Sequence, residues 1–134
     1  NIYVNADVAT VGPMIESLTD STTNEKNLHI TPNAPAIIFG STLLIKGDDP
    51  SVGIYFTKDE EGATPVKVSL IVRNTKSEII IQIPQLAEGQ YWLSVTTQAG
   101  ANYGLVKDPR TYKFPILLTG GIGGGGDSES PDEI

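Results

Sequence analysis

The single histidine of the chain is the first candidate for chemistry. His29 lies in a polar stretch that also contains Asp20 and Ser21. A Ser-His-Asp device requires an imidazole that a carboxylate holds next to a nucleophile. The spacing of these residues does not indicate that they converge, and the chain has no cysteine that could serve as an alternative nucleophile. We therefore expect His29 to be a surface loop residue and the protein to be non-enzymatic.

Two acidic clusters are the candidates for metal binding. They are Asp48-Asp49 and Asp59-Glu60-Glu61. Calcium takes about six to eight oxygen ligands, which neighbouring loops of a β-sandwich can supply. Neither cluster has the D-x-[DN]-x-[DN]-G spacing of a calcium loop. Both lie at the ends of expected strands, where acidic residues usually face water, so we expect no bound metal and no cofactor.

A glycine run near the C-terminus has the composition of a phosphate loop without its context. Gly120 to Gly126 is interrupted only by Ile122, and the acidic sequence DSESPDEI follows it. A phosphate cradle needs a preceding strand, a following helix, and Lys with Ser or Thr in register. We expect residues 120–134 to form a disordered, Gly-rich acidic tail.

Three aromatic residues remain as a candidate contact surface: Trp92, Tyr103 and Tyr112. Trp and Tyr are favoured at the centres of protein interfaces. Tyr103 belongs to a loop of small residues between the last two expected strands, where a rigid scaffold often presents binding groups. Two interpretations stay open. The aromatic residues form a contact patch for a protein partner, or they belong to a covered outer face of the sheet.

The elements that must position these residues are short β-strands. Nine prolines and fourteen glycines are scattered through the chain, and no window keeps a helical apolar period. Apolar, β-branched and aromatic runs bounded by turn residues occur instead, at 43–45, 52–56, 66–72, 79–83, 90–97 and 111–118. The pattern predicts an all-β protein, an immunoglobulin-like antiparallel β-sandwich of the Greek key type with about seven strands.

Alternation within the strands predicts which side chains are buried. Tyr91, Leu93 and Val95 point to the core, so Trp92 points outward. Tyr91 also follows Gly89 by two residues at the start of a late strand, which fits a tyrosine corner, although an ordinary turn before a strand has the same pattern. Residues 66–72 read as one half-buried strand. Pro115 marks the last strand as an edge strand or a bulged one.

Length and charge bound the organisation of the protein. The 134 residues fit one domain, and the formal net charge is −7. Residues 1–119 hold twelve Asp and Glu against nine Lys and Arg, and the tail adds four acids without a base. Such a body is a poor match for nucleic acid or an anionic membrane. We expect 1–12 to be a linker or N-terminal arm, 13–119 the Ig-like domain, and the whole chain a processed or excised part of a longer protein, since it begins with Asn1.

Six segments carry a resemblance to a known family: MIESLTD at 14–20, NLHITP at 27–32, LIKGDD at 44–49, GIYF at 53–56, YWLSVTTQ at 91–98 and PRTYKFPILL at 109–118. In this order the chain resembles a bacterial domain of unknown function with an Ig-like fold. That domain typically follows an N-terminal HU-like DNA-binding domain. The resemblance covers about residues 13–119, and it gives no catalytic residues to carry over.

The resemblance implies an accessory module that mediates protein contacts or self-association. DNA would be bound only through a separate upstream domain, and the chain would then be cytoplasmic and nucleoid-associated. The alternative is an exported adhesion-type or carbohydrate-binding sandwich, with Trp92 or Tyr103 stacking on a sugar ring. In neither case do we expect a membrane-spanning segment, because no apolar run approaches about 18 residues.

Overall fold

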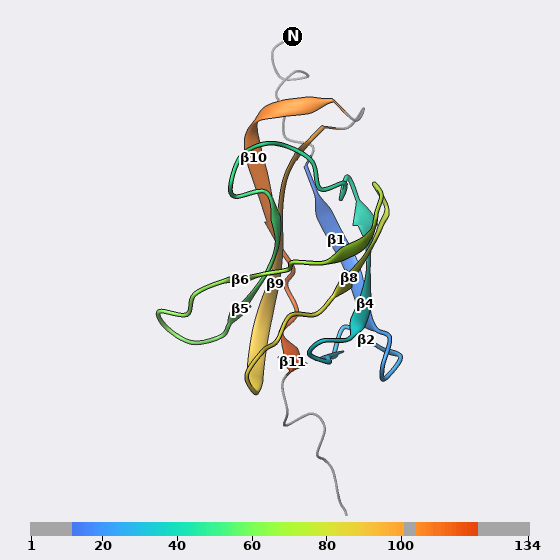
Figure 1. Ribbon diagram of the computed structural model, residues 1–134, viewed down its shortest axis with the longest axis vertical. Helices are drawn as coiled ribbons and strands as arrows, with labels where there is room; N and C mark the ends of the chain where they lie inside the picture. The colour runs from blue at the N-terminus through green and yellow to red at the C-terminus, as the bar shows by residue number, and fades with distance from the viewer. Residues whose placement is uncertain (1–11, 101–103, 121–134) are drawn as a thin grey trace, which may run out of the picture.

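The computed structural model describes residues 12–100 and 104–120, and these residues form strands without a helix. The strands make two sheets that face each other (Figure 1). None of the described residues belongs to a helix that is long and apolar enough to span a membrane. The strands are β1 (Met14–Asp20), β2 (Glu25–Lys26), β3 (His29–Ile30), β4 (Pro35–Ser41), β5 (Gly53–Lys58), β6 (Val66–Lys67), β7 (Ile71–Asn74), β8 (Glu78–Gln82), β9 (Gly89–Ala99), β10 (Leu105–Lys113) and β11 (Leu118–Gly120).

The strand order is that of an immunoglobulin-like sandwich, which confirms the predicted fold. The first sheet has the order β2-β1-β4-β8-β7 and the second β3-β11-β9-β5-β6, with β10 also pairing with β9. In immunoglobulin lettering, β1, β4, β8 and β7 take the places of A, B, E and D, while β5 and β9 take those of C and F. Strands β10 and β11 are successive parts of strand G. Strand β3 pairs in parallel with β11 and forms one edge of the second sheet.

The core lies between the two sheets and follows the alternation of the strands. In β9, Tyr91, Leu93 and Val95 are at most 3% exposed, as predicted. Phe56 of β5, in the same sheet, and Leu18 of β1, in the opposite sheet, belong to the same core cluster, and both are fully buried. Burying an aliphatic or aromatic side chain of this size contributes about 1.5–3 kcal/mol, so the closed core is the main source of stability.

The tyrosine corner predicted from the sequence is present. The Tyr91 hydroxyl donates a hydrogen bond of 2.7 Å to the carbonyl oxygen of Ala87. Ala87 lies in the connection between β8 and β9, where the chain crosses from the first sheet to the second. The bond therefore ties the crossover to the start of the strand that follows it.

The prediction of one strand over residues 66–72 was wrong. Val66–Lys67 pairs with β5 in the second sheet, and Ile71–Asn74 pairs with β8 in the first. Val68 is buried at the crossing, but Leu70 and Val72 are 48% and 65% exposed. The core lies on opposite sides of the two sheets. A chain that crosses from one sheet to the other therefore cannot keep a single alternation of buried and exposed side chains through the crossing.

Two further strands were misjudged between residues 35 and 45. Strand β4, in the middle of the first sheet, was not predicted at all. Residues 43–45 were expected to be a strand and instead form an irregular bridge between the sheets. The Leu43 amide donates to Lys76 O at 2.8 Å, and the Lys46 amide donates to the Thr97 hydroxyl at 3.1 Å. Leu43 is apolar because its side chain is fully buried in the core, not because it lies in a ladder.

The last predicted strand is interrupted at the proline. Strand β10 ends at Lys113 and β11 begins at Leu118, so Pro115 lies between the two strands. No backbone N–H is needed there for a hydrogen bond between strands, and proline has none to donate. Gly120, which was predicted to belong to the disordered tail, is a buried residue of β11. A Cβ there would lie 2.7 Å from Cγ1 of Ile30, so the close approach of β3 favours glycine. Residues 1–11 and 121–134, which include most of the expected arm and tail, lie outside the described residues.

Candidate functional site

The Trp92 side chain lies on the outer face of the second sheet, as its position in β9 requires. It is partly exposed and occupies the register position opposite Thr57 of β5. The indole N–H donates to the carboxylate of Asp59 at 3.0 Å, and the ammonium group of Lys113 lies 4.2 Å from the ring centroid. The ring is therefore held at its edge by an acid and contacted on a face by a cation.

The neighbouring strands explain why these partners meet. Asp59 directly follows β5, and its amide donates to Gln90 O at 2.8 Å, which keeps the strand end beside β9. Lys113 of β10 is opposite Ser94 of β9, and Ser94 is opposite Tyr55 of β5. The outer face of the second sheet is thus a polar surface with two aromatic rings set among lysines.

The three predicted contact residues do not form one patch. Tyr112 is opposite Val95, which is 1% exposed, and it packs against the core. Trp92 and Tyr112 consequently lie on opposite faces of the same sheet. Tyr103 lies outside the described residues. Of the predicted set, Trp92 alone is placed by the structure on an outer face.

The residues considered for catalysis have other partners. The His29 Nδ1 atom pairs with a carboxylate oxygen of Glu25, and both side chains are partly exposed. Asp20 is fully buried and accepts hydrogen bonds from the hydroxyls of Thr23 and Thr31 at 3.1 and 2.7 Å. Asp20 therefore fixes the turns between β1 and β4 and does not orient the imidazole.

Residues of both acidic clusters form hydrogen bonds or ion pairs with other residues of the domain. The Ser51 amide and hydroxyl donate to the Asp49 carboxylate at 2.9 and 2.7 Å, and these bonds lower the pKa of Asp49. The Asp59 carboxylate accepts a hydrogen bond from the Trp92 indole, and a carboxylate oxygen of Glu60 lies 3.7 Å from the Lys58 ammonium. Within residues 12–100 and 104–120, no three His, Cys, Asp or Glu side chains gather as a metal site would require.

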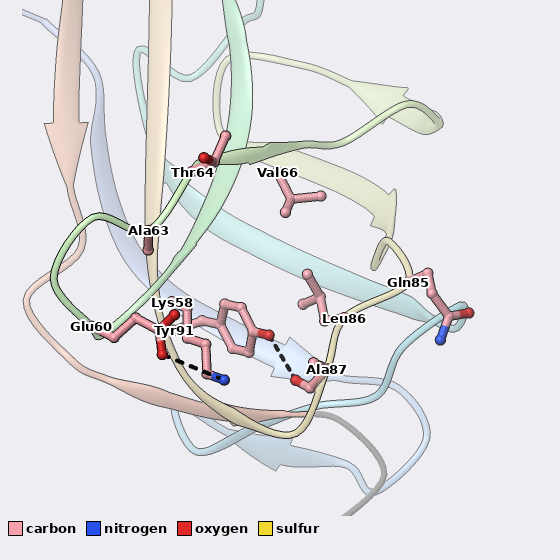
Figure 2. A pocket seen from close by; sticks show the side chains of 9 residues that line it. All are labelled: Lys58, Glu60, Ala63, Thr64, Val66, Gln85, Leu86, Ala87 and Tyr91. Carbon is pink, nitrogen blue, oxygen red and sulfur yellow. Dashed lines mark hydrogen bonds and ion pairs between the residues drawn. The ribbon is translucent and has the colours of Figure 1, made fainter.

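A shallow hollow beside the tyrosine corner was not found from the sequence. It has a volume of about 250 Å³ and lies between the β5–β6 turn and the β8–β9 connection. Figure 2 shows Tyr91 bonded to Ala87 on one side and the Lys58–Glu60 pair at the rim. Two loops distant in sequence build it, so no local pattern could have indicated it. The hollow is open to solvent, and the charged residues in its lining are Lys58 and Glu60.

At one end of the sandwich, the Gln98 side chain of β9 bonds to two separate segments. The Gln98 amide oxygen accepts the Asp49 N–H at 3.0 Å, and its amide nitrogen donates to the carbonyl oxygens of Val106 and Lys107 at 3.2 and 3.0 Å. The connection between β4 and β5 is thereby joined to β10. This network gives the end loops a fixed base from which to present side chains.

Comparison with protein families decides which group these features belong to. Residues 14–112 match the model of a domain of unknown function, DUF4469, with IG-like fold. The chain belongs to this family. The matched DUF4469 segment runs from the first residue of β1 to Tyr112 of β10, so it includes Trp92 and strands of both sheets but ends before Lys113 and β11.

A solved structure resembles this DUF4469 domain over most of its length. It is described as "Putative bacterial DNA binding protein" from Bacteroides vulgatus ATCC 8482, with 36% sequence identity and a TM-score of 0.72. The match covers 81% of this chain but 47% of the other, so the chain spans about half the length of the protein it matches. No curated protein matches the chain.

Proposed function

We propose that this domain is a non-enzymatic interaction module, the C-terminal Ig-like half of an HU-like DNA-binding protein. The observation that supports the proposal is the match to a longer protein, described as a "Putative bacterial DNA binding protein", of which the match covers 47%. In this arrangement the upstream half binds DNA, and the sandwich contributes contacts to a protein partner or to a second copy. The protein would then work in the cytoplasm, associated with the nucleoid.

The charge distribution supports assigning DNA binding to another half. Residues 1–119 carry more acids than bases, whereas phosphate binding requires a basic stripe. Lys67 of β6 and Lys113 of β10 lie on the second sheet, and Arg73 lies on the first sheet in an ion pair with Glu78. These cations are spread over two faces, which is unsuited to tracking a duplex.

The contacts of Trp92 favour this proposal over carbohydrate binding. A partly exposed tryptophan on a sheet is a suitable platform for a sugar ring. Here, however, Lys113 contacts the ring at 4.2 Å and Asp59 occupies the indole N–H. A sugar would have to displace the lysine to stack on that side of the ring. The same arrangement is compatible with a rim contact in a protein interface.

DNA binding by the 134-residue chain and by its full-length parent protein tests the proposal. Fluorescence anisotropy with a labelled duplex should give binding by the parent that is at least about 100-fold tighter than that of the isolated chain, with a steep salt dependence. Equal affinity of the two would place DNA binding in this domain and overturn the division of labour. A parent without an HU-like half, or turnover of generic ester or glycoside substrates that His29→Ala abolishes, would overturn the proposal itself.

A further inference from the structure

Two lysines on the outer face of the second sheet lie at the ends of one row that crosses four strands. Lys67 of β6 is opposite Tyr55 of β5, which is opposite Ser94 of β9. Ser94 is in turn opposite Lys113 of β10. Trp92 is the next outward residue along β9, toward the start of that strand. We call these five residues the lysine face: Tyr55, Lys67, Trp92, Ser94 and Lys113.

Both lysines are exposed, and neither has an acidic partner on the part of the chain that the structure describes. Each ammonium group lies over an aromatic ring, at 4.2 Å from the ring centroid for Lys113 and 6.0 Å for Lys67. The ion pairs among the described residues involve neither of them. On the first sheet, by contrast, Arg73 is paired with Glu78. The lysine face thus carries two positive charges that no described carboxylate neutralises.

The described part of the chain ends beside this face. Gly120 of β11 is opposite Gly89, the first residue of β9 (Figure 1). Ser94 lies five residues further along β9, about 17 Å away at the rise of a β-strand. Residues 121–126 can span up to about 20 Å. The segment that follows them is therefore within reach of the row that contains both lysines.

The composition of the chain after Gly120 suits a return to this face. Strand β11 runs antiparallel to β9, so the chain leaves β11 in the direction away from Trp92 and has to reverse. Five of the six residues 121–126 are glycine, which adopts the positive φ of a tight reversal more readily than other residues. These six residues carry no charge, so they can pass Asp59 without repulsion. Residues 127–133 then supply four acids and no base.

We propose that residues 127–133 bind back onto the lysine face of their own chain, where their carboxylates pair with Lys67 and Lys113 and the segment covers Trp92. The inference does not depend on the proposed function, and it identifies the occupant of the face as an acidic peptide.

The tether makes such a contact possible although its ion pairs are weak. Exposed ion pairs contribute little individually. A short flexible linker, however, holds a tethered segment at an effective concentration on the order of millimolar, which populates a contact that a free peptide would not make. Salt at about 0.5 M screens the charges and releases the segment. A partner with more acidic groups would displace it in the same way, so the segment acts as a removable cover of the lysine face.

Paramagnetic relaxation enhancement tests the contact, because the chain has one tryptophan and no cysteine. A nitroxide attached to the Ser130→Cys variant should broaden the indole N–H signal of Trp92 in a ¹⁵N-labelled chain at low salt. The broadening should fall at least about threefold at about 0.5 M salt, where the Debye length is only a few ångströms. Backbone amides of β7, in the first sheet, should keep their line widths.

Substitution of the lysines separates this contact from random encounters of a tethered segment. Lys67→Gln combined with Lys113→Gln should reduce the broadening of the Trp92 signal at least about threefold at low salt, because the screened attraction is then lost. Lys107→Gln is the matched control, since Lys107 is exposed at the other end of β9, beside Gln98. That variant should leave the broadening unchanged.

Neutralising the segment gives the same test without any change in the sandwich. The loss of broadening should be equal in a chain with four substitutions outside the described residues: Asp127→Asn, Glu129→Gln, Asp132→Asn and Glu133→Gln. A mixture of a ¹⁵N-labelled chain without nitroxide and a nitroxide-carrying chain without ¹⁵N should show no broadening, because the contact is within one chain.

Three outcomes would refute the inference. They are broadening spread evenly over both sheets, broadening that neither the lysine nor the acid substitutions reduce, and broadening in the mixture, which would place the segment on a second copy. The proposed function is tested separately, because DNA binding by the parent protein does not enter these signals. A parent without a DNA-binding half would overturn the function and leave the contact standing.

Discussion

At the residue scale, the most informative contact is the hydrogen bond between the Tyr91 hydroxyl and Ala87 O. The Tyr91 side chain is 3% exposed, whereas Ala87 is exposed, so the hydrogen bond lies at the edge of the core. The sequence indicated this contact because the glycine, the tyrosine and the strand start lie close together along the chain. Contacts between distant residues, such as those of Asp59 with Trp92 and of Gln98 with Asp49, left no such local pattern.

Tyr91→Phe should lower the free energy of unfolding by about 1–2 kcal/mol, because it removes the donor of a partly buried hydrogen bond that ties the crossover to β9. Urea denaturation followed by tryptophan fluorescence measures the loss. Tyr55→Phe is the matched control, since the Tyr55 hydroxyl bonds to Ser51 O at the same 2.7 Å but in an exposed place. We expect that change to cost less than about 0.5 kcal/mol. Equal effects of the two variants would deny the corner its structural role.

At the element scale, the close approach of β1 and β4 depends on one glycine. A Cβ on Gly40 would overlap the carbonyl oxygen of Met14 and come within 3.1 Å of the Ile15 Cα. Gly40 lies opposite Ile15, next to the irregularity in register between Ile15 and Ser17. Because backbone atoms cannot move aside as a flexible side chain can, any larger residue must separate the strands.

Gly40→Ala should therefore destabilise the domain by more than about 2 kcal/mol, within the range of severe overpacking. Thermal unfolding by circular dichroism gives the comparison. Gly104→Ala is the control, since a Cβ there meets no atom within 4 Å. If Gly40→Ala unfolds at the wild-type temperature, the two strands are not in the tight contact described above.

At the scale of the whole molecule, β11 is the last strand that the structure describes. Strand β11 pairs with both β9 and β3, and Leu118 is fully buried. Truncation after Gly120 removes only the Gly-rich acidic segment, which has too few apolar side chains to contribute to a core. Truncation after Leu117 also removes β11, which lies between β3 and β9 in the second sheet.

Deleting 121–134 should change the free energy of unfolding by less than about 0.5 kcal/mol, whereas deleting 118–134 should unfold the domain or cost several kcal/mol. Chemical denaturation of both truncations and the full chain measures the difference. A large loss from the shorter deletion would mean that the acidic segment packs against the sandwich.

The sequence by itself determined the fold class, the inward residues of β9 and the tyrosine corner. Each depends on a local pattern, such as a period of two residues or a turn followed by a strand. Only the tertiary structure decided where residues 66–74 change sheets, that Leu43 is buried outside a strand, and that Trp92 and Tyr112 lie on opposite faces. The contact between Ile37 and Ile80 was equally hidden, because it exists only when β4 and β8 lie side by side. Pairing between segments about 40 residues apart depends on the closure of the whole core, and no short stretch of the chain encodes it.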